Sequence, residues 1–557
     1  MPFPFLAFDL WTLGVALLLV SFYVLADFIA LLWRQCFSPL RNLRGPPSPS
    51  SLFGNLREMY NQENTGLLYD WDATYGSTYA YKGFLGGSRL MTTDVTAVTH
   101  ILTHSYAYQK PDFVRDSLAA MGTGHAGLLT TEGDVHKRQR RILAPAFTAA
   151  HITSLAPIFW DKATELRDIW IQLANEDSQR TSPIDVLTWL SRATLDVIGA
   201  AGFGYHFNAL AGQSDELANA YHLIFTTAKK LQLRTILETW IPLLRIFRPL
   251  SKAMQQARGY STRIGLRLID ERKTTMAAEA AVEWNDKQQR PVSPKHPECR
   301  DLLSILVQSN MASFASQRMT TSEVLCQITT FLIAGHETSS SALTWCLYAL
   351  AKAPECQSAL RDALRTISPE SSTLHDDVAK LEYLDWVVRE TLRLHAPVTW
   401  TMRVAMEDDE IPVRQPFYDV NGQLNKVIKI AKHDIITIPI QAINKSKSIW
   451  GEDAHTFRPE RWRNPPESSK AVQSLYSNTL TFLGGNRGCI GYRFALAEIK
   501  AFLFTLVRDL EFSIDPAIII EKTFNMVARP VVKSESTSGN NMPLSIRPAS
   551  PIRAPHS

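Results

Sequence analysis

Residues 482–491 read Phe482-Leu483-Gly484-Gly485-Asn486-Arg487-Gly488-Cys489-Ile490-Gly491, and they are the most informative segment of the chain. Four glycines surround one cysteine, and an arginine stands two residues before the sulfur. Glycine lets the backbone turn tightly and approach a flat ligand closely, and a cysteine in such a loop can offer a thiolate to a metal. The alternative is a buried structural cysteine beside a glycine-rich turn, since free cysteine usually only packs.

The segment matches the pattern Phe-x-x-Gly-x-Arg-x-Cys-x-Gly at its fixed positions, which are Phe482, Gly485, Arg487, Cys489 and Gly491. This pattern is the haem-ligand signature of the cytochrome P450 superfamily, so the chain resembles a haem-thiolate monooxygenase. The resemblance implies that Cys489 ligates the iron of haem b and that its thiolate favours O–O cleavage. It also implies that the other four positions bind the cofactor.

The composition allows one large enzyme and argues against several other classes. The chain has 557 residues, of which 45% are hydrophobic and 20% charged, with a net charge of +4. We find no concentrated basic tail of the kind that nucleic-acid binders carry, so no nucleic-acid partner is expected. The six cysteines are scattered and form no CxxC pair. We therefore expect neither a disulfide framework nor a zinc site. We also expect the catalytic body to lie in a reducing compartment.

The N-terminus predicts a membrane anchor over residues 1–33. Leu10 to Ala26 carries no charge, Asp27 interrupts the apolar run, and the run resumes to Trp33. A helix over residues 10–33 would be about 36 Å long, enough to cross a hydrocarbon core of about 30 Å. A cleaved signal peptide is the alternative, but nothing basic precedes Leu10.

Three arginines at 34, 41 and 44 follow this span. By the positive-inside rule they place the body in the cytosol. The expected location is therefore the endoplasmic reticulum membrane, with a single pass and a cytosolic catalytic domain. Residues 34–50 are basic and proline-rich and predict a stiff hinge. We expect the catalytic domain at 51–546 and a disordered tail at 547–557.

Periodicity in the body indicates a chain that is mainly α with small β-sheets. Helical apolar spacing covers 183–201, 320–352 and 379–395. Short β-branched runs lie at 77–82 and 427–440. Periodicity alone indicates only a large helical protein, whereas the resemblance implies the cytochrome P450 fold behind one N-terminal transmembrane helix.

Polar residues with three prolines predict a surface loop at 283–300.

A second motif, Ala334-Gly335-His336-Glu337-Thr338, lies inside a long apolar helical pattern. A glycine costs about 1 kcal/mol in a helix interior, and such rule-breaking often marks function. The alternative is a kinked helix with a surface acid. The motif resembles the family's Ala-Gly-x-(Asp/Glu)-Thr, which implies that Gly335 leaves room for a bound diatomic and that Glu337 and Thr338 relay protons. His336 occupies the variable position of the motif and is interpreted as a neutral filler rather than a metal ligand.

A third motif pairs charges for structure. Glu390 and Arg393 are three residues apart and share a helix face. Alone this spacing is typical of a surface ion pair, which contributes little. With Pro459-Glu460-Arg461-Trp462 downstream, it resembles the family's buried triad. The resemblance implies that Glu390, Arg393 and Arg461 lock the core behind the haem loop.

Basic residues are the candidates for binding the haem propionates. His136 and Arg140 are four apart on one helix face, at the place where the family commonly has Trp-x-x-x-Arg. Arg403 and Arg487 are the other predicted contacts. The adjacent Lys137, Arg138 and Arg141 are either a solvated helix face or a dock for an acidic flavoprotein reductase.

Three apolar regions resemble the family's substrate-recognition segments: 113–129, 222–250 and 398–402. The apolar patch at 240–247 is either ordinary core or a surface that dips into the bilayer. No charged residue lies in 398–402, which favours a lipophilic substrate.

The sequence thus predicts a monooxygenase that inserts one atom of O2 into a lipophilic small molecule, by analogy a terpenoid-type secondary metabolite. Electrons from NADPH arrive through a separate cytochrome P450 reductase, because the chain has no GxGxxG fingerprint or flavin domain. Three alternatives stay open: a fatty-acid hydroxylase, a reductase-independent haem-thiolate isomerase or dehydratase, and a non-enzymatic haem- or sterol-binding membrane protein. The intact Glu337–Thr338 pair argues against the isomerase.

Overall fold

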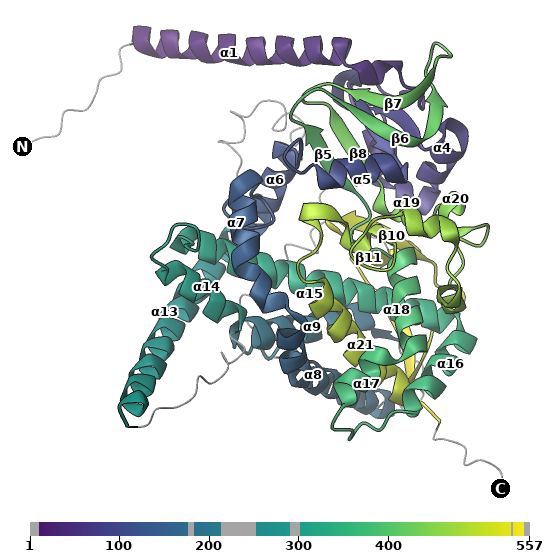
Figure 1. Cartoon of the computed structure of the whole chain (residues 1–557). Helices are drawn as coiled ribbons and strands as arrows, with labels where there is room; N and C mark the ends of the chain where they lie inside the picture. The colour runs from purple at the N-terminus through teal and green to yellow at the C-terminus, as the bar shows by residue number, and fades with distance from the viewer. Residues whose placement is uncertain (1–9, 177–182, 213–251, 290–300, 536–538, 551–557) are drawn as a thin grey trace, which may run out of the picture.

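The computed structural model describes residues 10–176, 183–212, 252–289, 301–535 and 539–550. The chain is mainly helical with small sheets, as predicted, and α15 crosses the middle of the body (Figure 1). The helices in the first half are α1 Leu10–Phe37, α2 Leu56–Tyr60, α3 Gln62–Thr65, α4 Leu67–Tyr75, α5 Val95–Thr103, α6 Asp112–Leu118, α7 Gly133–Leu143, α8 Ala149–Glu176, α9 Val186–Phe203 and α13 Lys252–Gln289. Those in the second half are α14 Leu302–Met311, α15 Thr321–Lys352, α16 Pro354–Arg365, α17 Leu374–Lys380, α18 Glu382–Leu394, α19 Ile440–Asn444, α20 Lys447–Trp450 and α21 Tyr492–Asp509.

The strands form one five-stranded sheet and three smaller ones. The five-stranded sheet has the order β1-β2-β8-β5-β3, and the smaller sheets are β4-β12-β9, β6-β7 and β10-β11. The strands are β1 Thr78–Lys82, β2 Ser88–Thr92, β3 Tyr108–Gln109, β4 Ile184–Asp185, β5 Thr401–Ala405, β6 Asp409–Tyr418, β7 Leu424–Ile430, β8 Ile435–Ile438, β9 Leu510–Ser513, β10 Ile520–Asn525, β11 Val527–Val532 and β12 Pro543–Pro548.

Helix α15 is the axis of the core. A capping box starts it: the Thr320 hydroxyl accepts from the Glu323 N–H, and the Glu323 carboxylate accepts from the Thr320 N–H. The helix then packs along α9, and its apolar side chains join the largest core cluster. Helix α21, which follows the Cys489 loop, packs on α8 and also contacts α15. The two motif-bearing segments are therefore held against the same core.

The helices predicted from periodicity correspond to α9, α15 and α18, and the predicted strands to β1 and to β7 with β8. The surface loop predicted at 283–300 is wrong over its first part, because α13 continues to Gln289. Glutamate, lysine and glutamine favour the helix there, and the first proline is Pro291. The rest of that prediction lies outside the described residues.

Two predicted boundaries also shift. Helix α1 runs through the start of the predicted hinge, and Arg44 O accepts a hydrogen bond from Ala80 N at 2.9 Å, so residues 34–50 are docked on β1 rather than free. The predicted tail at 547–557 begins inside β12, whose last two residues pair with Glu511 and Leu510 of β9. Residues 551–557 of that tail lie outside the described part of the chain.

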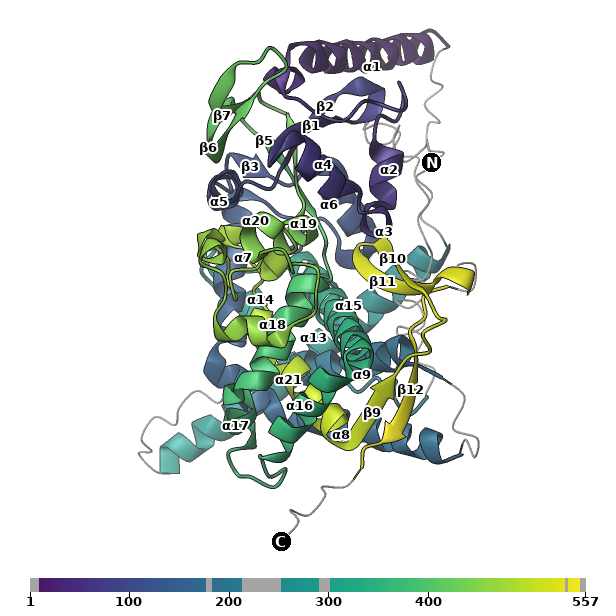
Figure 2. The ribbon, with the colours of Figure 1, turned by 90° about the vertical axis from the view of Figure 1, so that its right-hand side faces the viewer.

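Helix α1 covers the predicted anchor from Leu10, and its C-terminal end meets the body beside β2 and the β6–β7 hairpin (Figure 2). Within the described ranges, no single helix combines the length and apolarity needed to cross a membrane. The bent helix pair Gly133–Phe147 and Ala149–Glu176 together meets this requirement, by length and composition alone. The transmembrane helix stays a prediction.

Candidate active site

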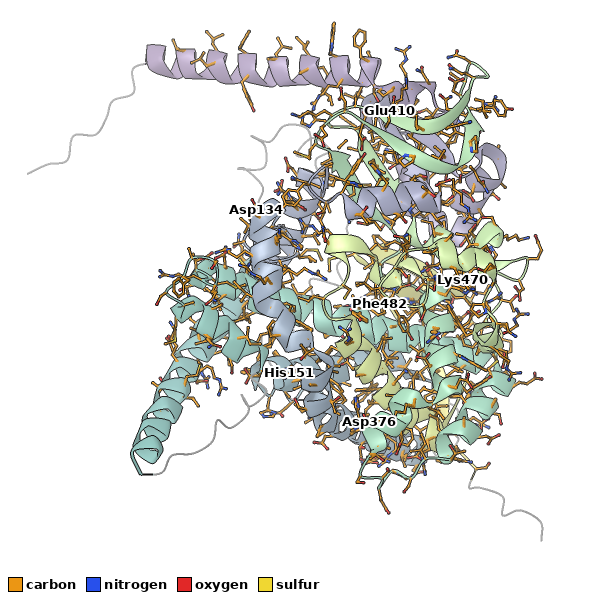
Figure 3. The ribbon with its side chains drawn as sticks, viewed as in Figure 1. Asp134, His151, Asp376, Glu410, Lys470 and Phe482 are labelled. Atoms are coloured by element: carbon orange, nitrogen blue, oxygen red, sulfur yellow. The ribbon has the colours of Figure 1, made fainter. Side chains whose placement is uncertain are left out.

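Glycines shape the loop that holds Cys489. Cys489 N donates to Phe482 O at 2.9 Å, which closes the loop just before α21; Phe482 lies within the body (Figure 3). Gly485 has φ +64°, and a Cβ there would lie 2.3 Å from Leu102 O. A Cβ at Gly488 would lie 2.6 Å from Leu475 Cδ1. Only glycine allows the backbone this turn and this approach, so the sequence fixes the position of the sulfur.

The Cys489 side chain is accessible to solvent, yet surrounding protein desolvates it. This combination is typical of a group that lines an internal space. Desolvation raises the pKa of the thiol, while the Gly491 N–H and the positive charge of Arg140 lower it. The sulfur also lies at the N-terminal end of α21, where the helix dipole favours negative charge. A metal ion would complete the stabilisation of a thiolate here.

The middle of α15 presents one accessible face. Between residues 327 and 347 all side chains are buried except those of Ala334, Gly335 and Thr338. The Thr338 hydroxyl donates to Ala334 O at 2.7 Å. A Cβ at Gly335 would lie 2.9 Å from Ile198 Cγ1. The missing side chain of Gly335 lets α9 approach α15, and its predicted role of leaving room for a diatomic ligand stays a prediction.

Glu337 is buried and held by two partners. Its carboxylate pairs with the Arg529 guanidinium of β11, and His336 Nε2 lies 3.0 Å from Glu337 Oε1. Desolvation raises the pKa of this carboxyl, but Arg529 and His336 outweigh it and lower the pKa to about 2. His336 is thus a partner of the acid and not a filler. Both its ring nitrogens face acceptors, since Nδ1 lies 2.6 Å from Leu332 O.

Phe147 joins the cysteine loop to α15. A Cβ at Gly491 would lie 3.6 Å from the Phe147 ring, and the rings of Phe147 and Phe331 are 5.4 Å apart between centroids. Both motifs therefore border one region of the interior, with α7 closing it through the electrostatic contact of Arg140 with Cys489.

Arg403 is a buried cation with an unsatisfied donor. Its Nη1 donates to Thr401 Oγ1 at 2.8 Å and to Met402 O at 2.7 Å. Its Nη2 is buried and has no hydrogen-bond partner in the described part of the chain. Burial lowers the pKa of Arg403 to about 10. An unpaired donor on a buried charge is costly, so the site favours an anion at this nitrogen.

Further basic side chains gather around Arg403. Burial, with Lys110 and Arg140, lowers the pKa of His136 to about 4, so this ring is neutral near pH 7. Lys110, which the sequence analysis missed, donates to Leu129 O at 2.8 Å. Its pKa falls well below the usual value through burial and then through Arg487 and Arg403. Lys110, His136, Arg140, Arg403 and Arg487 are the cation cluster below.

Arg487 differs from its prediction. Its guanidinium pairs with the Glu132 carboxylate and donates to Thr131 O at 2.8 Å. It is therefore already partnered, and Arg403 and Arg140 are the better candidates to hold a further anion. In the neighbouring basic run, Arg138 pairs with Glu323 and Arg141 donates to Ser316 O at 3.0 Å. Lys137 is exposed.

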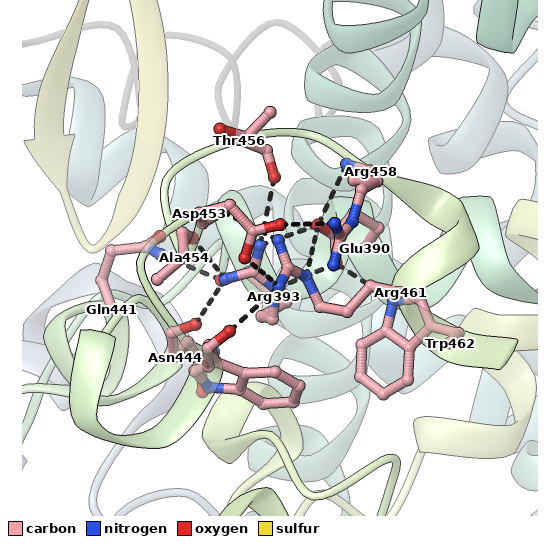
Figure 4. Close-up of polar contacts among 11 residues, drawn as sticks. Glu390, Arg393, Gln441, Asn444, Asp453, Ala454, Thr456, Arg458, Arg461 and Trp462 are labelled. Atoms are coloured by element: carbon pink, nitrogen blue, oxygen red, sulfur yellow. Dashed lines mark hydrogen bonds and ion pairs between the residues drawn. The ribbon is translucent and has the colours of Figure 1, made fainter. Parts of the chain in front are cut away.

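The third motif forms one buried cluster (Figure 4). The Arg393 guanidinium donates to both oxygens of Glu390, at 2.9 and 2.7 Å, and Arg461 Nε donates to Oε1 at 3.3 Å. The sequence analysis missed two members. Trp462 Nε1 donates to Glu390 Oε2 at 3.0 Å, and Asp453 accepts from Arg461 at 2.6 Å. Glu390, Arg393, Asp453, Arg461 and Trp462 are the closed cluster below.

A cavity of about 260 Å³ is lined mainly by apolar side chains. Two of the predicted substrate segments reach it, through Phe113 and through Thr399, Trp400 and Met402. Ala528 of β11, next to Arg529, also lines it. The predicted segment 222–250 and the patch at 240–247 lie outside the described residues.

A cysteine in a glycine cradle at the start of α21, together with a helix that carries an acid–alcohol pair, defines a haem-thiolate class of site in an α-rich fold. The cytochrome P450 profile matches residues 44–534, and the chain belongs to this family. It is 43% identical to cytochrome P450 monooxygenase 205 of Postia placenta over 96% of this chain and 97% of that protein. It is 32% identical to cytochrome P450 monooxygenase claQ of Ampulloclitocybe clavipes over 97% and 98%. The protein is an oxidoreductase of the monooxygenase family.

Haem b fits the residues present. Membership of the family implies a haem iron held by a thiolate and an external electron donor. Cys489 is the matching donor, and the glycine cradle admits a flat ligand. The cation cluster, with its unpaired Arg403 nitrogen, is suited to the two propionates.

Proposed function

We propose that this protein is a membrane-anchored monooxygenase that inserts one oxygen atom from O2 into a lipophilic small molecule, by hydroxylation or epoxidation, in terpenoid-type secondary metabolism. Cys489 in its glycine cradle, with the Glu337–Thr338 pair on α15, carries the proposal. Bound through a thiolate, haem supplies the activated oxygen that attacks an unactivated carbon.

The chain's own residues hold the cofactor and handle protons. Cys489 ligates the iron, and Arg403 and Arg140 pair with the propionates. Thr338 offers its hydroxyl as the proton donor of the accessible face of α15. Glu337 passes protons on to Thr338 in this proposal; because Arg529 holds it as a carboxylate at rest, it must loosen that ion pair to accept a proton.

The electron partner and the location follow from two surfaces. Electrons come from NADPH through a separate cytochrome P450 reductase, for which exposed Lys137 on α7 is a docking residue. The endoplasmic reticulum membrane is the proposed location, with the catalytic domain in the cytosol. In support, α1 exposes large apolar side chains, and Leu18 and Phe22 are each 71% exposed.

The test is the carbon monoxide difference spectrum of Cys489→Ala. We expect the red-shifted band of thiolate-bound haem to disappear, while Cys356→Ala, at a half-buried position of α16, keeps it. An unchanged spectrum in Cys489→Ala would refute the ligand assignment. Turnover that needs NADPH and reductase separates a monooxygenase from an isomerase or a non-enzymatic binder.

A further inference from the structure

The 260 Å³ cavity contains a buried cation with no acidic partner. Arg89 of β2 lines the cavity and is only 7% exposed. Its guanidinium makes no ion pair or side-chain hydrogen bond with any residue that the structure describes. The guanidinium lies over the Phe113 ring, with 6.0 Å between Arg89 Cζ and the ring centroid. A buried guanidinium without an anion is costly, which points to a ligand.

The fold keeps the space around Arg89 open. A Cβ at Gly83 would lie 2.5 Å from Arg89 Nε and 3.1 Å from Cζ, so glycine at this position lets the guanidinium pass. The neighbouring Tyr81 hydroxyl is already bonded to Thr437 Oγ1 at 2.9 Å. Arg89, unlike Tyr81, has no side-chain hydrogen bond in the described part of the chain.

Sheet register separates Arg89 from the cation cluster. Leu90 and Arg403 both pair with Ile436 of β8, so these three residues lie in one row on one face of the sheet. Successive residues of a strand point to opposite faces. Arg89 therefore faces away from Arg403, and its anion is not a haem propionate.

Two other charged residues, Lys522 and Glu63, also line the cavity. Burial lowers the pKa of Lys522, and the negative charge of Glu63 opposes that shift. The Lys522 ammonium lies 5.0 Å from the centre of the Trp345 ring, and its buried Nζ has no hydrogen-bond partner in the described part of the chain and is closed off from the cavity space. Arg89 is therefore the cation that a ligand in the cavity can reach. Leu56, Met59, Phe84, Trp400 and Phe524 supply apolar wall.

We propose that this cavity binds an amphiphilic carboxylic acid, with its carboxylate on Arg89 and its apolar body along Trp400 and Phe524. The inference rests on the proposed function and narrows its substrate class. A guanidinium binds a carboxylate in a bidentate, charge-assisted way. Met402 and Ala528 line the cavity from β5 and β11, the strands that also carry Arg403 and Arg529, so the cavity and the active site share two strands. In this proposal the apolar body points toward the active site, and oxidation occurs at a carbon remote from the carboxyl group.

The position of α1 suits such a substrate. Gln35 at the end of α1 donates to Phe84 O at 3.4 Å, and a Cβ at Gly87 would lie 2.6 Å from Gln35 Nε2. The Phe84 side of the cavity therefore adjoins the proposed anchor. An acid that partitions into the bilayer interface would reach Arg89 from there.

The test compares acids with their matching alcohols. The probes are dodecanoic acid with dodecanol and abietic acid with abietinol, which separate a fatty acid from a terpenoid acid. Binding to the purified holoenzyme is measured by calorimetry. We expect one acid to bind about 10- to 100-fold more tightly than its alcohol, as a charge-assisted hydrogen bond provides.

Arg89→Gln should abolish the preference for the acid and leave alcohol binding unchanged. Arg89→Lys should retain part of that preference. Gly83→Ala should weaken the preference, because the added Cβ displaces the guanidinium. The matched control is Lys82→Gln, because Lys82 pairs with Ser88, carries the same charge and points to the opposite face of the sheet. Equal haem content and circular dichroism show that each variant is folded.

Equal binding of both acids and alcohols by the wild-type protein would overturn the proposal. So would a preference that survives Arg89→Gln or that is lost in Lys522→Gln instead. Failure of the monooxygenase proposal is a separate result, since it is read from the carbon monoxide spectrum and from NADPH dependence.

Discussion

The closed cluster around Glu390 and the cation cluster around Arg403 are both buried, but they treat charge in opposite ways. In the closed cluster the two buried arginines, Arg393 and Arg461, meet the carboxylates of Glu390 and Asp453, and Trp462 donates a further hydrogen bond to Glu390. The exposed Arg458 also pairs with Asp453, at 2.8 Å. In the cation cluster Lys110, Arg140, Arg403 and Arg487 meet one carboxylate, Glu132, among the residues that the structure describes. A neutral cluster stabilises the chain itself, whereas surplus buried charge is held for an anionic ligand.

The largest expected effect is in the closed cluster. Glu390→Gln should destabilise the protein by about 3–5 kcal/mol, because it leaves two buried guanidinium groups without their shared carboxylate. Urea unfolding followed by tryptophan fluorescence measures the change, and the haem-to-protein ratio should fall with it. Glu452→Gln removes an exposed carboxylate paired with Lys447 and should cost less than about 1 kcal/mol. Soluble, haem-loaded Glu390→Gln protein of unchanged stability would show that the cluster is not structural.

The closed cluster also shows how far the sequence reaches. Spacing of three residues in a helix predicts that Glu390 and Arg393 meet, and the motif order predicts Arg461. Asp453 and Trp462 were missed because loop conformation, rather than periodicity, brings them to Glu390. Lys110 was missed for the same kind of reason: β3 pairs Gln109 with Val404, which places Lys110 beside Arg403 only once the sheet register is known.

Gly335 shows what a motif leaves out. The motif predicts a glycine that makes room for a ligand, and the structure adds that a side chain at this position would meet Ile198 of α9. A motif fixes which residue types occur together, but the helix rotation decides which neighbour each one faces. That rotation depends on the packing of α9, which the local sequence does not contain.

The buried Glu337–Arg529 ion pair should stabilise the fold, as the paired charges of the closed cluster do. Arg529→Met should lower stability at pH 7 by about 2 kcal/mol, because Glu337 keeps only His336 as a partner. In the wild type the pKa of Glu337 is lowered to about 2. The stability it contributes is therefore complete above about pH 4.5 and is lost as the pH falls toward 2.

In Arg529→Met the pKa of Glu337 rises, so protonation of Glu337 destabilises the variant less than it destabilises the wild type. The difference in unfolding free energy between the two proteins should therefore narrow below pH 4.5. Thermal unfolding between pH 7 and pH 4 checks this. A gap that is independent of pH would mean that Arg529 acts by packing and not by pairing with the carboxylate.

The smallest change in unfolding free energy is expected for Arg403→Met in the cation cluster. Arg393→Met makes the same substitution in the closed cluster and is its matched comparison. Arg403→Met gives up the hydrogen bonds to Thr401 and Met402 but also removes a desolvated charge, so the fold should change by less than about 1 kcal/mol. Haem transfer to apomyoglobin should become about 10-fold faster, since one propionate loses a charged partner. Arg393→Met should instead lose soluble protein, as it removes the bidentate partner of Glu390 and leaves the buried carbonyls of Asn444 and Ala454 without their donor. If both variants lose folded protein to the same extent, by circular dichroism and yield, surplus positive charge does not mark a ligand site in this protein and the distinction between the two clusters fails.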